Sequence, residues 1–306
     1  MRLVLLSVGL GVILVVTTLA AISEPSTKST PPLLELSAAE SNAGAESAAY
    51  LPPHRGGTVV WAVGDGADGS EVSKSVARMI FERRVDRFLY LGDVYETGTA
   101  AEYQNNYRPV YGSLDKKTAP TIGNHEYTNR ATGYTPYWTR VHGRAPEYYA
   151  IRASGWQIIS LNSEADHSAD SDQLAWLRSK IETTPRFGDC RIAFWHQPRY
   201  SAGFYGDTPS KEPFWEVLAD RARIVINGHE HDIQKMKPRR GINEFVSGAG
   251  GHSPRDTNEL DPRLSYSNDQ ERGALRLEVG RESVQWRFVS PRAGKLADGR
   301  IRCTRN

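Results

Sequence analysis

The stretch FLYLGDVY, residues 88–95, decides how the chain is expected to fold. Its apolar half, residues 88–91, predicts a short buried strand that stops at Gly92 and Asp93. Glycine lets the backbone turn sharply, and open α/β sheets bind their ligands at the carboxyl ends of such strands. Alone, this Gly-Asp pair is a weak signal, because aspartate is also a common turn residue.

Four other polar groups follow apolar runs in the same way. They are Asp65 after residues 59–63, Asn124 with His125 after 121–122, His196 after 192–195, and His229, Glu230 and His231 after 224–226. Most are residue types that bind metal ions, and each group lies where a predicted strand ends. Packing alone hardly explains five coincidences of this kind, so we predict one shared site at the ends of these strands.

The spacing of apolar residues predicts an α/β fold. Residues 58–63 and 87–91 are expected to be parallel strands joined by a helix over 70–84, the usual length of a right-handed crossover. Further strands are expected at 119–122, 148–152, 156–161, 191–195, 223–226, 244–246, 273–279 and 283–289, and helices at 101–110, 172–182 and 213–222. The rest of 127–155 is expected to be long loops. The pattern predicts a four-layer sandwich of two mixed β-sheets flanked by helices.

The first part of the chain is expected to direct export. Residues 3–22 are almost wholly apolar, so residues 1–23 are interpreted as a signal peptide or, if uncleaved, an N-terminal anchor. Residues 24–56 are rich in Ser, Ala and Pro and are predicted to be a disordered linker, leaving 57–306 as the folded domain. The expected location is therefore secreted, periplasmic or cell-surface, with membrane contact only through an uncleaved first segment.

Charge and cysteine content limit the partners and the compartment. The 38 basic and 36 acidic residues give a net charge of +2, so no nucleic-acid partner is expected. Cys190 and Cys303 are the only cysteines. In an oxidising compartment they can form one disulfide that would hold the C-terminal tail to the sheet; the alternative is two free thiols.

The predicted ligand set suggests hydrolytic chemistry at a pair of metal ions. Aspartate, asparagine and histidine together suit Fe, Mn or Zn better than Ca. Two metals lying close together could share one bridging carboxylate, and Asp93 is the best-placed candidate. Such a pair activates a hydroxide and clamps the oxygens of a phosphoryl group, which predicts in-line attack on a phosphate ester.

Five motifs support this interpretation through a resemblance to a known family. They are Gly64-Asp65, Gly92-Asp93, GNHE at 123–126, a strand ending in His196, and GHEH at 228–231. In order and spacing they resemble the calcineurin-like metallophosphoesterases over residues 57–290. That family has Asp-x-His at the first motif, where this chain has Ala67. The purple acid phosphatase branch lacks that histidine and has a tyrosine in Gly-Asp-x-x-Tyr, whereas Tyr95 here comes one residue earlier.

The resemblance implies a role for each matching residue. Asp65, Asp93, His231 and Tyr95 would bind a first metal ion, and Asp93, Asn124, His196 and His229 a second. His125 matches the family's catalytic histidine, and Asn124 and His125 would contact the phosphate. The implied cofactors are two metal ions, Fe paired with Fe, Zn or Mn. His252, after the run GAGG at 248–251, is left out of the predicted site.

The predicted function is an exported, metal-dependent phosphoric ester hydrolase of the acid phosphatase type that acts on small phosphate monoesters. One alternative is a phosphodiesterase or nucleotide hydrolase that uses the same site. A second is a non-catalytic surface module that binds metal or phosphate. Ala67 and the displaced Tyr95 keep that second alternative open, while the intact pair Asn124-His125 argues against it.

Overall fold

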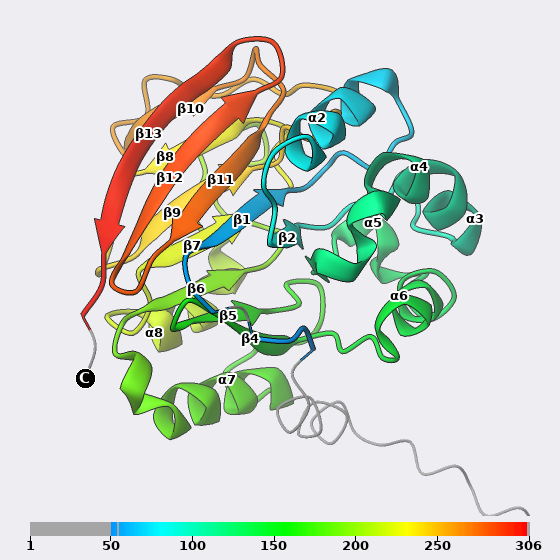
Figure 1. Cartoon of the computed structure of the whole chain (residues 1–306). Coiled ribbons are helices and arrows are strands. Elements are labelled where there is room, and N and C mark those ends of the chain that lie inside the picture. The colour runs from blue at the N-terminus through cyan, green and yellow to red at the C-terminus, as the bar shows by residue number, and fades with distance from the viewer. Residues whose placement is uncertain (1–49, 54, 305–306) are drawn as a thin grey trace, which may run out of the picture. The chain divides into compact units, whose positions relative to one another are not determined.

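The computed structural model describes residues 50–53 and 55–304 (Figure 1). The predicted signal peptide or anchor and most of the predicted linker lie outside these residues. In the described part of the chain, no helix is both long enough and apolar enough to cross a membrane.

The first sheet has six strands in the order β13-β12-β11-β1-β2-β3. Their bounds are β1 (Thr58–Val63), β2 (Arg87–Tyr90), β3 (Thr118–Pro120), β11 (Ala274–Val279), β12 (Ser283–Ser290) and β13 (Gly294–Arg302). Strands β1, β2 and β3 run parallel, with Ala62 opposite Leu89 and Leu89 opposite Ala119. The other three join antiparallel. The sheet is mixed, as predicted.

The second sheet has seven strands in the order β10-β8-β9-β7-β6-β5-β4. Their bounds are β4 (Tyr149–Ala153), β5 (Trp156–Ser160), β6 (Arg191–Phe194), β7 (Ile224–Asn227), β8 (Ile233–Met236), β9 (Asn243–Ser247) and β10 (Leu264–Asn268). Strands β5, β6, β7 and β9 are parallel, whereas β4 pairs antiparallel with β5, β8 with β9, and β10 with β8.

Helices cover the outer face of each sheet (Figure 1). The first sheet carries α2 (Glu71–Phe81), α4 (Arg108–Tyr111) and α6 (Tyr134–His142), and the second carries α7 (Asp172–Thr183) and α8 (Glu212–Leu218). Helix α2 begins where the Ser70 side chain accepts the Ser73 N–H, which satisfies one free donor of the first turn. Its buried residues Val76, Met79 and Ile80 follow the predicted helical spacing.

Alternation along the strands produces the four layers. In β1, Val60 and Ala62 pack between the sheets, whereas Trp61 packs under the helices. In β6, Ile192 packs between the sheets and Ala193 faces α7 and α8. Successive side chains of a strand point to opposite faces, so each sheet is apolar on both faces. One face packs on the other sheet and the second face packs on helices. The predicted four-layer sandwich of two mixed sheets is confirmed.

Several predicted elements differ from the structure. Helix α6 lies within the stretch predicted to be loops, and its tyrosines and tryptophan are buried under the first sheet. The predicted helix 101–110 is α3 (Ala100–Glu102), a π-helical turn at Tyr103–Tyr107 and then α4. Strands β8, β10 and β13 were not predicted, because polar residues such as Gln234 and Lys235 interrupt their apolar pattern.

The folded part begins before the predicted boundary at residue 57. Tyr50 and Leu51 are buried between the sheets, and the Tyr50 ring packs 4.4 Å from that of Tyr149. Two apolar residues within a Ser- and Pro-rich segment hardly change its average composition, and for that reason composition alone placed them in the linker.

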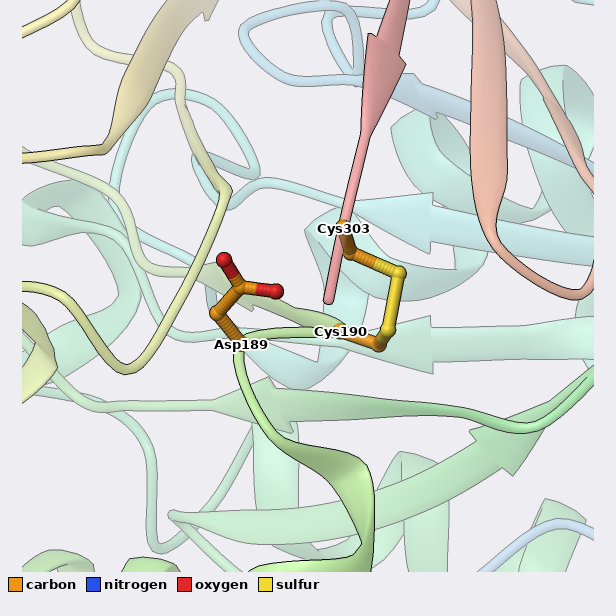
Figure 2. Close-up of side chains that lie close together, drawn as sticks. All are labelled: Asp189, Cys190 and Cys303. Atoms are coloured by element: carbon orange, nitrogen blue, oxygen red, sulfur yellow. A yellow bond between two sulfur atoms is a disulfide. The ribbon is translucent and has the colours of Figure 1, made fainter. Parts of the chain in front are cut away.

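Cys190 and Cys303 form a disulfide with an S–S distance of 2.00 Å (Figure 2). The bond joins the residue before β6 to the residue after β13, so it ties the end of the first sheet to the second. It closes a loop of 113 residues, which stabilises the folded chain by about 4–5 kcal/mol in the chain-entropy model. The structure therefore contains the disulfide and not two free thiols.

Candidate metal centre

Both sheets contribute to one cluster of polar side chains. Asp65 follows β1 and Asp93 follows β2, while α5 (Asn124–Tyr127) begins after β3. From the second sheet, His196 follows β6, and His229 with His231 lies between β7 and β8. Because these strands end at the same edge, residues up to 166 positions apart meet there. The structure brings together all eight residues predicted from the sequence.

Tight turns carry the ligand candidates. Asp65, Asp93 and His229 have positive φ values of 59°, 69° and 70°. Residues with a Cβ adopt this region at a cost of about 1–2 kcal/mol, and such strain concentrates at functional sites. The glycine before each allows close approach: a Cβ on Gly92 would lie 2.8 Å from His196 Nδ1, and one on Gly228 2.7 Å from Asp65 Oδ2.

One half of the cluster, the tyrosine half, consists of Asp65, Tyr95 and His231. The Tyr95 hydroxyl lies 3.2 Å from Asp65 Oδ1, 3.1 Å from His231 Nε2 and 3.4 Å from Asp93 Oδ2. All four side chains are buried. Tyr95 therefore reaches the site although it comes one residue early.

The other half, the amide half, consists of Asn124, His196 and His229. His196 Nε2 lies 3.0 Å from Asn124 Oδ1, 3.2 Å from His229 Nδ1 and 3.3 Å from Asp93 Oδ1. Asp93 therefore turns Oδ2 to the tyrosine half and Oδ1 to the amide half.

Backbone carbonyls orient two of the histidines for metal binding. His196 Nδ1–H donates to the Leu91 carbonyl at 2.8 Å, and His231 Nδ1–H donates to the Ser253 carbonyl at 2.6 Å. A carbonyl only accepts, so each ring has its proton on Nδ1 and turns Nε2, the atom available as a metal ligand, toward the cluster. Lone pairs of imidazole, amide and carboxylate then converge on one space at the edge of the two sheets, and a cation is the partner that satisfies all of them. The residues present fit a metal ion.

The electrostatics of the cluster point the same way. Burial and the neighbouring His196 lower the pKa of His229 to about 3, and burial lowers that of His231 to about 4, so both imidazoles are neutral ligands at ordinary pH. Burial raises the pKa of Asp65. Burial also opposes ionisation of Asp93, but His196 and His125 outweigh it and lower that pKa. Burial likewise opposes a charge on His196, but Asp93 outweighs it and raises the pKa of that ring, so a metal ion bound there would take the place of a proton. Buried carboxylates and neutral imidazoles together attract a cation.

His125 lies at the open rim of the site. Its backbone N–H donates to Asp93 Oδ1 at 3.1 Å, and its Nδ1–H donates to the Glu96 carbonyl at 2.6 Å. Nε2 is left to face the cluster, 3.8 Å from Asp93 Oδ2, and the side chain is 30% exposed. The ring can thus contact both the cluster and a molecule that enters from solvent.

Glu126 supports the site from behind. Its buried carboxylate accepts the N–H groups of Asp93 at 3.0 Å and Val94 at 3.2 Å. Burial and the charge of Asp93 raise the pKa of Glu126 to about 7. Its contacts are with the turn that carries Asp93.

Ala67 holds Tyr95 through the backbone. The Tyr95 N–H donates to the Ala67 carbonyl at 3.1 Å, and Ala67 pairs with Val94 in a short parallel bridge. The buried methyl group of Ala67 cannot bind a metal. The position where the sequence departs from Asp-x-His therefore helps to place the tyrosine.

His252 packs against the site, although the sequence around it does not predict this. Its ring stacks on Tyr95 with centroids 3.8 Å apart, and its backbone N–H donates to the Asp65 carbonyl at 3.0 Å. The signal was the glycine run before it: a Cβ on Gly250 would lie 2.2 Å from the Gly64 carbonyl oxygen, so this turn packs directly on the first motif.

Two packed mixed sheets with such a cluster at their shared edge match the class of metal-dependent phosphoric ester hydrolases. Residues 54–232 match the family model described as calcineurin-like phosphoesterase. The match covers more than half of the chain, which therefore belongs to this family. Members bind two metal ions, and Asp65, Asp93 and His196 form a candidate site in this chain.

The chain is also similar to purple acid phosphatases. It is 22% identical to human tartrate-resistant acid phosphatase type 5 over 69% of this chain and 73% of the relative. A purple acid phosphatase from yellow lupin seeds superimposes with a TM-score of 0.64 and 12% identity over 81% of this chain and 54% of the other. GAP50, the anchor in the inner membrane complex of Plasmodium, superimposes with a TM-score of 0.68 and 15% identity over 81% and 90%. At these identities the two structures show a shared fold.

Proposed function

We propose that this protein is an exported phosphatase that hydrolyses small phosphate monoesters with two metal ions. The observation that carries the proposal is the position of Asp93. One of its oxygens lies 3.4 Å from the Tyr95 hydroxyl of the tyrosine half, and the other lies 3.3 Å from His196 Nε2 of the amide half. A carboxylate between two ligand sets is suited to bridge a metal pair.

Asp65, Asp93, Tyr95 and His231 would hold the first metal, and Asp93, Asn124, His196 and His229 the second. The phenolate oxygen of Tyr95 favours ferric iron in the first position, with Fe, Zn or Mn in the second. When bound, such a pair activates a water molecule and neutralises charge on a phosphoryl group.

The protein's own residues would bind the ester and handle the proton. The side-chain amide of Asn124, an exposed residue, can donate to a phosphate oxygen while its Oδ1 faces the cluster. His125 presents Nε2 at the rim, where a proton on that atom can pass to the leaving oxygen. The Glu96 carbonyl holds the ring in this orientation, because it fixes a proton on Nδ1.

Export is the second part of the proposal. Residues 1–23, the proposed signal peptide or anchor, lie outside the described part of the chain. The Cys190–Cys303 disulfide supports a secreted, periplasmic or cell-surface location, since such bonds persist in oxidising compartments.

The function is tested with purified protein from which metals are removed and then restored. We expect 4-nitrophenyl phosphate to be hydrolysed only with metal present, with kcat/KM well above that for bis(4-nitrophenyl) phosphate. A higher kcat/KM for the diester would replace the proposal with the phosphodiesterase alternative. No hydrolysis of either ester with two metals bound would favour the non-catalytic module.

A further inference from the structure

Two adjacent aromatic residues stand exposed beside the amide half. Phe204 is 62% exposed and Tyr205 is 46% exposed. The Tyr205 ring stacks on His229 with centroids 4.5 Å apart and an interplanar angle of 30°, and the Phe204 ring packs edge-on against Tyr205 at 5.2 Å. An aromatic surface therefore runs from a candidate metal ligand out into solvent.

Glu230, the residue between the two histidines of the GHEH motif, holds this surface in place. Its buried carboxylate accepts the Ser201 hydroxyl at 2.8 Å, the Tyr205 N–H at 3.0 Å and the Gly206 N–H at 2.8 Å. A Cβ on Gly203 would lie 2.6 Å from the Glu230 carboxyl carbon, so the loop lies directly against it. The rings are exposed, but the loop that carries them is fixed at several points. A ligand that binds the rings therefore does not lose free energy by ordering the loop.

Arg255 completes the surface. Its Nη2–H donates to the Tyr205 hydroxyl at 3.2 Å, and its guanidinium carbon lies 4.7 Å from the centroid of the Phe204 ring. A guanidinium over one ring face is an attractive contact that restrains both rings. We name Phe204, Tyr205 and Arg255 the aromatic lip.

We propose that the aromatic lip binds a planar aromatic group attached to the substrate's phosphate, so that an aryl phosphate binds more tightly than an alkyl one. This inference rests on the proposed function. A phosphate bound beside Asn124 and His229 must direct its substituent toward solvent, and the lip begins at the His229 ring. An aryl group can stack on the exposed rings and bury apolar surface there, whereas a small alkyl group buries little.

Binding of two phosphonates, which are not hydrolysed, tests the lip without turnover. Calorimetry on the full-length, metal-loaded protein compares phenylphosphonate with methylphosphonate. We expect phenylphosphonate to bind about tenfold tighter, the factor that partial burial of a ring provides. Phe204→Ala should remove most of this preference and leave the affinity for methylphosphonate unchanged.

Phe81→Ala is the matched control, since Phe81 is also an exposed phenylalanine (44%). It is the last residue of α2 and belongs to neither half of the site. This variant should keep the full preference. Equal affinities in the unmodified protein, or a preference that survives Phe204→Ala, would overturn the role of the aromatic lip and leave the proposed function standing. Failure of both phosphonates to bind would overturn the proposed phosphate site and, with it, the inference that depends on it.

Discussion

The two halves of the candidate metal centre share Asp93 but differ in ligand chemistry and in access to solvent. The tyrosine half offers a carboxylate, a phenol and an imidazole, all buried. The amide half offers an amide and two imidazoles, and Asn124 is exposed. Oxygen donors, the phenolate above all, suit a more highly charged ion, and imidazoles suit divalent Fe, Zn or Mn. From this comparison we expect two unlike metals, with substrate entering at the amide half.

The largest effect is expected where the halves meet. Asp93→Ala should remove a ligand from both metals and lower kcat/KM by at least about 10³-fold, because the metal pair acts as a unit. Metal analysis should find fewer than two ions per chain. Asp298→Ala, at a half-exposed carboxylate on β13, is the control and should keep both. Two tightly held ions in Asp93→Ala would contradict the shared ligand.

The next largest effect concerns the rim. His125→Ala should lower kcat by about 10²- to 10³-fold, the usual contribution of a general acid, while both metals stay bound. The loss should be larger for an alkyl phosphate than for 4-nitrophenyl phosphate, since a poor leaving group depends more on proton transfer. A loss that is the same for both esters would argue against His125 as the acid.

Tyr95→Phe tests whether the two halves bind their metal ions independently. Removing the hydroxyl takes one ligand from the tyrosine half only, so we expect one metal to bind about 10- to 100-fold more weakly and the other to be unchanged. Titration of metal-free protein measures both binding steps. If both steps weaken equally, or neither does, the division into halves is wrong.

The smallest effect is expected at His252, which stacks on Tyr95. His252→Ala should weaken the same binding step as Tyr95→Phe by about tenfold or less, because it only orients the ligand. His252→Phe keeps a ring for the stack and should restore most of the affinity. A larger loss in His252→Phe than in His252→Ala would argue against a role in stacking.

The amide half could be predicted more fully than the tyrosine half. Asn124 lies in a contiguous motif, and His196 directly follows a strongly apolar strand, so motif and strand pattern located both. Tyr95 was uncertain because its position depends on the turn after β2 and on the bridge between Ala67 and Val94, which no residue pattern encodes. His252 was missed because a loop from another part of the chain brings it to Tyr95.

The same contrast holds for the fold. Strands buried on both faces, such as β1 and β6, are continuous apolar runs and were predicted within about a residue of their ends. Strand β13 lies at the edge of its sheet, and much of it is polar or partly exposed, so its sequence carries little strand signal. Helix α6 was not predicted for a related reason: its buried face is made of tyrosine and tryptophan, which are also common in loops.

The most direct test of the two unequal halves is metal analysis together with a visible absorption spectrum of the same purified sample. We expect two metal ions per chain and a purple charge-transfer band that disappears in Tyr95→Phe, which would place ferric iron on that tyrosine. A colourless protein that holds one ion or none, and stays inactive when metals are added back, would contradict the two-metal centre.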